Sequence, residues 1–113
     1  MKKQALITGA TSGIGRATAL RLSADGWDVA ATGRRAERLD ALRREIEAAG
    51  GGCRTLAFDI RDEAACHAAL DGLERIDLLV NNAGLAAGFE HLDRGSTADW
   101  NAMIDTNVKG LLY

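Results

Sequence analysis

Short apolar runs alternate along the chain with longer amphipathic stretches. The run over 5–7 contains no polar residue, which is typical of a strand buried on both faces of a parallel sheet. We expect strands over 5–7, 28–32, 53–58 and 77–81. We expect helices over about 14–25, 35–49 and 62–73, and a last one that starts at Ser96 and runs through Leu111.

The helix predicted over 35–49 has the clearest pattern. Leu39, Leu42, Ile46 and Ala49 recur at spacings of three and four, which places them on one face of a helix, and glycines follow at 50–52. Ser96-x-x-Asp99 is typical of a capped helix start. Strand and helix thus alternate through 1–113, which predicts βαβ units on a parallel sheet and a single α/β domain.

Composition and charge narrow the function classes. The 113 residues have a net charge of −2, with 47% hydrophobic and 27% charged residues, as in ordinary globular domains. Without a basic excess or a long apolar run, we expect neither a nucleic-acid nor a membrane partner. Cys53 and Cys66 form no C-x-x-C pair and His67 and His91 have no ligand spacing, so we expect no metal site and a reducing cytoplasm.

A glycine-bearing turn joins the first predicted strand to the first helix. It reads T-G-A-T-S-G-I-G over 8–15, and Arg16-Ala17 in place of Lys-Ser/Thr excludes a Walker loop. Glycines at this place let a dinucleotide pyrophosphate approach the backbone, where the N–H groups at the helix start bind it. The alternative is that the glycines merely allow a tight turn. The context predicts a Rossmann-type doubly wound sheet with strand order 3-2-1-4.

The ends of the second and third strands suggest which nucleotide binds. In NAD enzymes an acidic residue follows the second strand, whereas Gly33-Arg34-Arg35 stands here. Two guanidinium groups suit a 2′-phosphate, so we expect NADP(H) in preference to NAD(H). Asp59, after the third strand, could accept a hydrogen bond from an adenine amino group or cap the next helix.

Asn81-Asn82-Ala83-Gly84 follows the fourth predicted strand. Together with the T-G-x-x-x-G-x-G turn, it resembles the short-chain dehydrogenase/reductase family over the whole chain. The resemblance is closest to the NADP-dependent 3-hydroxy acid dehydrogenases of the serine 3-dehydrogenase type, in the stretches 31–35, 37–39, 81–86, 99–100, 103–107 and 109–111.

The resemblance implies a hydride transfer between NADP(H) and the hydroxyl or carbonyl of a small 3-hydroxy acid, in a homo-oligomer (tetramer or dimer). It makes Asn107 the active-site asparagine, and 85–91 the border of the substrate cleft. It implies that the cofactor is bound by Thr8, Gly9, Thr11, Ser12, Gly13, Ile14 and Gly15 at the pyrophosphate, Arg34 and Arg35 at the 2′-phosphate, Asp59 and Ile60 at the adenine, and Asn82, Ala83 and Gly84 along the adenine ribose.

Asn107 can also be interpreted from the helix pattern alone. It falls on the face marked by Trp100, Met103, Ile104 and Val108, so we expect a buried amide that must be hydrogen-bonded. Its partner could be the backbone of a neighbouring strand, or, by the resemblance, a water held by a catalytic lysine.

The family also uses a serine and a Tyr-x-x-x-Lys pair for its chemistry. The single tyrosine here is Tyr113, with no lysine after it, and the last apolar helix has no C-terminal cap. We therefore expect a cofactor-binding portion of a longer chain, inactive alone. The alternatives are a stand-alone NADPH-binding module, another NADP-dependent reductase such as a 3-oxoacyl reductase, and a remnant that binds nothing.

Overall fold

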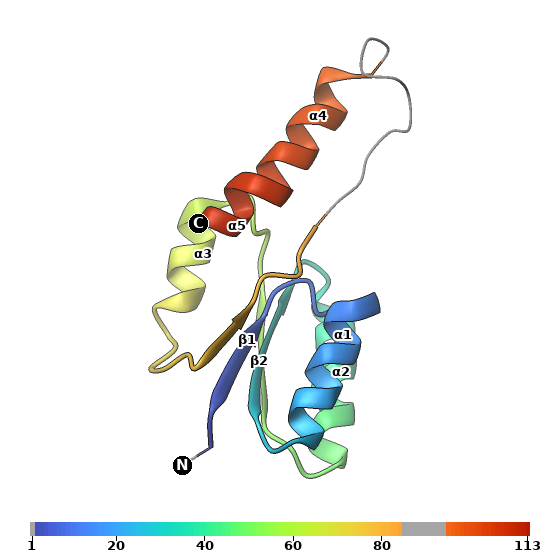
Figure 1. Ribbon diagram of the computed structural model, residues 1–113, viewed down its shortest axis with the longest axis vertical. Coiled ribbons are helices and arrows are strands. Elements are labelled where there is room, and N and C mark those ends of the chain that lie inside the picture. The colour runs from blue at the N-terminus through green and yellow to red at the C-terminus, as the bar shows by residue number, and fades with distance from the viewer. Residues whose placement is uncertain (1, 85–94) are drawn as a thin grey trace.

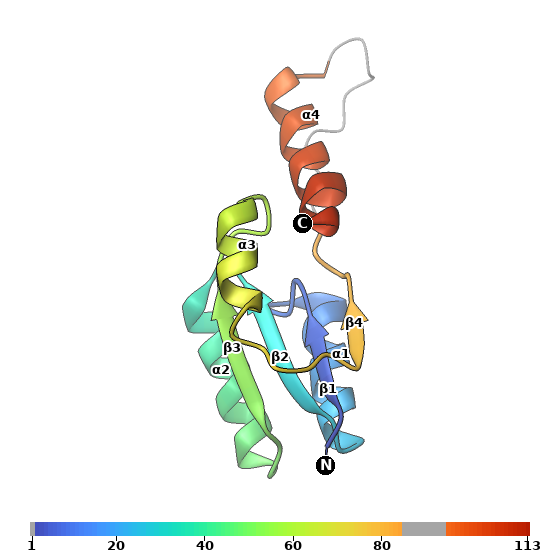
Figure 2. The ribbon, with the colours of Figure 1, turned by 90° about the vertical axis from the view of Figure 1, so that its left-hand side faces the viewer.

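The fold is built on a parallel sheet of four strands in the order β3-β2-β1-β4. A computed structural model describes residues 2–84 and 95–113. The strands are β1 (Gln4–Ile7), β2 (Asp28–Gly33), β3 (Cys53–Ala57) and β4 (Leu78–Val80). This confirms the α/β fold class and the expected strand order, which is visible from edge to edge in Figure 2.

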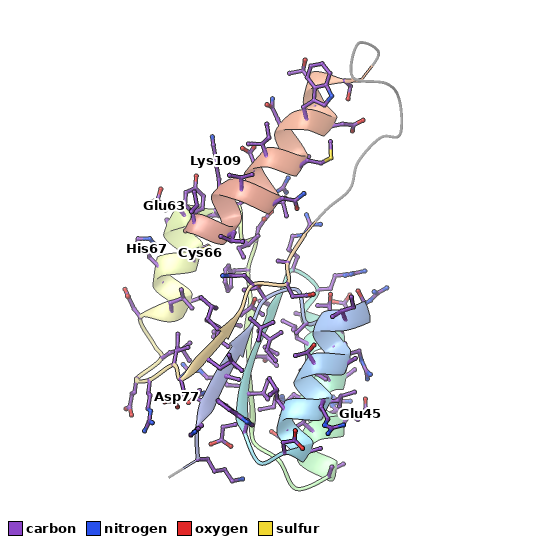
Figure 3. All side chains as sticks on the ribbon, viewed as in Figure 1. Glu45, Glu63, Cys66, His67, Asp77 and Lys109 are labelled. Atoms are coloured by element: carbon purple, nitrogen blue, oxygen red, sulfur yellow. The ribbon has the colours of Figure 1, made fainter. Side chains whose placement is uncertain are left out.

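Helices cover both faces of the sheet. Helices α1 (Gly13–Ala24) and α2 (Ala36–Ala48) lie on one face, and α3 (Glu63–Leu70) lies on the other (Figure 1). An ion pair between Arg16 of α1 and Glu45 of α2 joins the two helices, and Figure 3 labels Glu45. The third helix is shorter than the expected 62–73, because Asp62 is its N-cap and the chain turns at Leu70, whose carbonyl accepts from the N–H of Leu73.

The core lies between the sheet and the helices α1 and α2. Its largest buried side chains are Ile7, Val29, Leu39, Leu42 and Ile46. The predicted stripe of α2 is therefore confirmed except at Ala49, which is exposed because the helix has already ended there.

The opposite face of the sheet is less well covered. Cys66 is the one residue of α3 that is fully buried, and Leu79 on β4 is half exposed. The two faces of the sheet therefore contribute unequally to stability.

The last helix differs from the prediction in two ways. It is divided into α4 (Thr97–Ile104), a five-residue π-helix η2 (Asp105–Lys109) and α5 (Gly110–Leu112), where one continuous α-helix was expected. The apolar face expected to be buried is half exposed at Ile104 and Val108. Figure 1 shows the reason: α4 rises away from the end of the sheet, so these side chains have no surface to pack against in the described part of the chain.

The structure says little about two of the predictions, the one for the segment 85–91 with His91 and the one for a membrane partner. The segment 85–91 and His91, expected at the substrate cleft and the surface, lie outside the described residues. Among residues 2–84 and 95–113, no helix has the length and apolar character to cross a bilayer.

Asp77 joins the start of β4 to the start of β1 (Figure 3). Its Oδ2 accepts from the backbone N–H of Gln4 at 2.8 Å, and its own N–H donates to the Gln4 carbonyl at 2.9 Å. The N–H of Gln4 and then the guanidinium of Arg75 hold the pKa of Asp77 below its usual range. A carboxylate with a lowered pKa adds stability above its unfolded-state pKa and loses it as the pH falls through the folded-state value.

We expect Asp77→Asn to be less stable than the wild type at pH 7 and to lose less stability as the pH falls below about 4. The amide keeps an acceptor for Gln4 but carries no charge to lose. Urea unfolding at several pH values measures this, with the exposed Asp71→Asn as a control. Parallel pH profiles of wild type and Asp77→Asn would contradict the assignment.

Candidate cofactor-binding site

A cleft of about 300 Å³ opens at the carboxyl ends of the strands. This is the edge at which open α/β sheets bind their ligands. The residues that line it come from the end of β2, the segments that follow the strands, and η2: Gly9, Thr11, Ser12, Thr32, Gly33, Arg34, Arg35, Phe58, Asp59, Ile60, Asn82, Ala83, Gly84 and Thr106.

Most of the residues predicted from the sequence meet in this cleft. Those that do not line it are Thr8, Gly13, Ile14, Gly15 and Asn107. The lining also includes four residues that were not predicted. Thr32, Gly33 and Phe58 adjoin predicted positions, so extending each strand-end motif by one or two residues would have found them. Thr106 had no sequence signal, because the path of η2 brings it to the cleft.

Thr8 lies under the cleft and holds two of its walls together. It is 6% exposed, and its Oγ1 accepts from the backbone N–H groups of Asn82 and Ala83, both at 3.0 Å. Its own N–H donates to the carbonyl of Val80 at 3.1 Å. Thr8 therefore attaches the segment after β4 to the start of the glycine turn.

The glycine turn packs too closely for side chains. Gly9 has a φ of +66°, and its carbonyl accepts from Nδ2 of Asn82 at 3.1 Å. A Cβ on Gly15 would overlap both that carbonyl oxygen and the Asn82 amide. The first turn of α1 can therefore sit directly beside the segment after β4.

The start of α1 keeps its positive end free for an anion. The side chain of Ser12, the N-cap, makes no capping hydrogen bond, and the first turn has no acidic residue. By contrast, the first turns of α2, α3 and α4 carry Glu37, Glu63 and Asp99. Unpaired N–H groups and the helix dipole favour a phosphate there, with no carboxylate to repel it. Ile14 projects into solvent and is 78% exposed.

Two guanidinium groups follow β2 at the cleft. Arg35 donates from Nη2 to Oγ1 of Thr11 at 3.2 Å, and Arg34 is 64% exposed. A Cβ on Gly33 would meet the methyl group of Thr11, so the acidic residue of NAD enzymes has no room here. Charge and shape in this corner both favour a phosphate over a free ribose hydroxyl pair.

Asp59 faces the same corner from the end of β3. Arg61 donates to both of its carboxylate oxygens, and these hydrogen bonds are the main reason that the pKa of Asp59 lies below its usual range. Capping of the next helix, one of the two sequence interpretations of Asp59, is wrong. Asp62 caps α3, because its Oδ1 accepts from the N–H of Ala65 at 3.0 Å.

Asn107 differs from its prediction. It is exposed rather than buried, because η2 does not pack its full face against the sheet. It nevertheless stays close to the cleft, since a Cβ on Gly84 would lie 3.4 Å from its Oδ1. Asn107 thus lies within reach of the segment after β4, although it does not line the cleft.

We expect Thr8→Val to lower the free energy of unfolding by about 1–3 kcal/mol, because the partly buried N–H of Ala83 loses its acceptor while the shape is kept. Thr55→Val is the control, since Thr55 is a partly buried β3 residue of the same size whose hydroxyl makes no hydrogen bond within the described residues. Chemical denaturation measures both variants. Equal losses would show that the Thr8 hydroxyl has no special role.

Comparisons with known proteins agree with this architecture. The sequence profile of the short chain dehydrogenase family matches residues 3–113. A serine 3-dehydrogenase of Agrobacterium fabrum is 54% identical over 111 residues, and an NADP-dependent 3-hydroxy acid dehydrogenase of Salmonella typhi is 47% identical over 112 residues. These matches cover 95% and 96% of this chain but only 43% and 44% of the relatives.

Solved structures give the same result. The closed form of a serine dehydrogenase complexed with NADP+ superposes with a TM-score of 0.90 at 45% identity, over 97% of this chain and 45% of that one. The chain spans less than half the length of the curated relatives named here. The matching profile and the high identities together show that the chain belongs to the short-chain dehydrogenase family.

Proposed function

We propose that this chain binds NADP(H) at the cleft and forms the cofactor-binding portion of an oxidoreductase. The observation that carries the proposal is the start of α1, which has a glycine cradle and no acidic residue, beside the paired arginines after β2. A diphosphate and a 2′-phosphate are the anions that these two positions suit. The names of the Salmonella relative and of the serine dehydrogenase complex, which both include NADP, support the proposal.

Each part of the nucleotide has a proposed set of contacts. The backbone of 9–15, including Gly13, Ile14 and Gly15, with the hydroxyls of Thr11 and Ser12, binds the pyrophosphate, and Thr8 positions this turn. Arg34 and Arg35 bind the 2′-phosphate. The adenine lies against Asp59 and Ile60, and its ribose lies along Asn82, Ala83 and Gly84.

The proposed reaction is a hydride transfer between NADP(H) and the hydroxyl or carbonyl carbon of a small 3-hydroxy acid, such as serine or 3-hydroxypropionate. NADP(H), when bound, supplies or accepts the hydride. Within this chain Asn107 is the proposed catalytic residue. The substrate class rests on the names of the two relatives and on the matching stretches of sequence.

A nucleotide-binding module without catalysis is the second candidate. No tyrosine or lysine is found among the described residues that line the cleft. The side chains that surround it bind anions and hydrogen-bond to a nucleotide, and none of them is a strong general acid or base near neutral pH. Binding and turnover therefore have to be measured separately.

We expect NADPH to bind more tightly than NADH, and Arg34→Asp to weaken NADPH binding by about tenfold or more while NADH binding changes little, since only NADPH has the 2′-phosphate. Titration by fluorescence or calorimetry measures both affinities. Arg44→Asp is the control, because Arg44 pairs with Asp40 within α2. Equal affinities of the wild type for NADPH and NADH would refute the 2′-phosphate assignment.

We expect NADP+ reduction with L-serine or 3-hydroxypropionate from a chain that also carries the serine and Tyr-x-x-x-Lys pair of the family, and none from residues 1–113 alone. The absorbance of NADPH measures it. Turnover by residues 1–113 would show that the chemistry needs neither of those groups. If the longer chain binds NADPH but does not turn over these substrates, the result would favour the nucleotide-binding module without catalysis.

A further inference from the structure

Arg61 holds Asp59 in a fixed position at the edge of the cleft. Its backbone N–H donates to Oδ1 at 2.9 Å, Nε lies 3.1 Å from both carboxylate oxygens, and Nη2 donates to Oδ2 at 2.7 Å. Planar guanidinium and carboxylate groups paired through two or more hydrogen bonds are geometrically well defined. Both oxygens of Asp59 are therefore engaged by a residue of the same turn.

Arg34 forms only a long ion pair with the same carboxylate and makes no hydrogen bond to it. Its Nη1 lies 4.0 Å from Oδ2 of Asp59, beyond hydrogen-bond distance, and its side chain makes no hydrogen bond within the described residues. Arg34 lines the cleft, whereas Arg61 does not. The arginine that faces the ligand thus stays available, and the arginine outside the cleft neutralises the acid.

The position of Asp59 matters because a carboxylate and a 2′-phosphate compete for the same guanidinium. An acid without its own partner would both attract Arg34 and repel the phosphate. Arg61 removes both effects through its pairing with Asp59. The carboxylate of Asp59 is the main reason that the pKa of Arg61 is raised, and the negative charge of Asp105 on η2 adds a smaller contribution.

We propose that Arg61 is a positioning residue that sets the preference for NADP(H), by engaging Asp59 and so leaving Arg34 for the 2′-phosphate. The inference rests on the proposed function, since it concerns the same cleft. It adds to that function a residue that lies outside the cleft and acts through Asp59. Asp59 thus has two arginine neighbours with different roles. Arg61 neutralises its charge, and Arg34 must stay free of its hydrogen bonds to bind the 2′-phosphate.

The test compares NADPH and NADH affinities in the wild type and four variants. We expect Arg61→Gln to lower the ratio of NADPH to NADH affinity by about two- to fivefold, the effect expected for an exposed ion pair. Arg61→Lys keeps the charge but loses the planar fork, so the ratio should fall here as well, by less. In the double variant Arg61→Gln/Asp59→Asn, the ratio of NADPH to NADH affinity should return to that of the wild type, because no carboxylate remains to pair with Arg34.

Arg38→Gln is the control for charge alone. It removes an exposed positive charge from the first turn of α2, where it has no contact with Asp59 in the described structure, and the ratio should stay that of the wild type. Thermal unfolding without nucleotide checks that each variant folds. If Arg61 had only a general structural role, Arg61→Gln would lower the affinities for NADPH and NADH equally and leave their ratio unchanged.

The outcomes separate this inference from the function on which it rests. A wild type that binds NADPH and NADH equally refutes the proposed function, and the inference with it. A wild type that prefers NADPH, with Arg61→Gln keeping that preference, refutes the inference alone. The inference is also overturned if Arg61→Lys behaves as wild type, if Arg38→Gln lowers the ratio equally, or if Asp59→Asn fails to restore it.

Discussion

The close packing of the glycine turn against the segment after β4 is the constraint on which the cleft depends. The Gly9 carbonyl accepts from the Asn82 amide, and the absence of a Cβ on Gly15 lets α1 begin directly beside both. Thr8 adds two hydrogen bonds from beneath. Because buried polar groups must be paired, these contacts fix one arrangement of the strand ends. The start of α1 consequently lies beside the cleft, and its N-cap Ser12 is one of the lining residues.

The charges that surround the cleft differ from one part of it to another. At the start of α1 the positive end of the helix meets no carboxylate, whereas between the ends of β2 and β3 Arg34 lies beside the acid Asp59. Arg61 compensates that acid from outside. Each region of the cleft therefore presents donors or positive charge to a bound anion, although the chain as a whole is slightly acidic. Local arrangement, rather than net charge, determines what this surface can bind.

Much of the fold could be predicted because its signals are local. The stripe of Leu39, Leu42 and Ile46 has the period of a helix, and the apolar runs have the character of buried parallel strands. The division of the last helix into α4, η2 and α5 could not be predicted, since Trp100, Met103 and Asn107 keep an unbroken helical spacing. The exposure of Ile104 and Val108 likewise depends on which neighbours the chain supplies, and spacing does not encode this.

The sequence by itself determined the alternation of elements, the strand order and the motifs at the strand ends. The signals for these features are local: the hydrophobic period, the glycines and the capping residues each concern a few neighbouring positions. The right-handedness of βαβ crossovers then limits the possible strand orders. Only the tertiary structure decided how those motifs meet: that Asp62 rather than Asp59 caps α3, that Thr106 reaches the cleft, and that Arg61 rather than Arg34 hydrogen-bonds to Asp59. These outcomes depend on distances between side chains of separate segments, which only the packed chain defines.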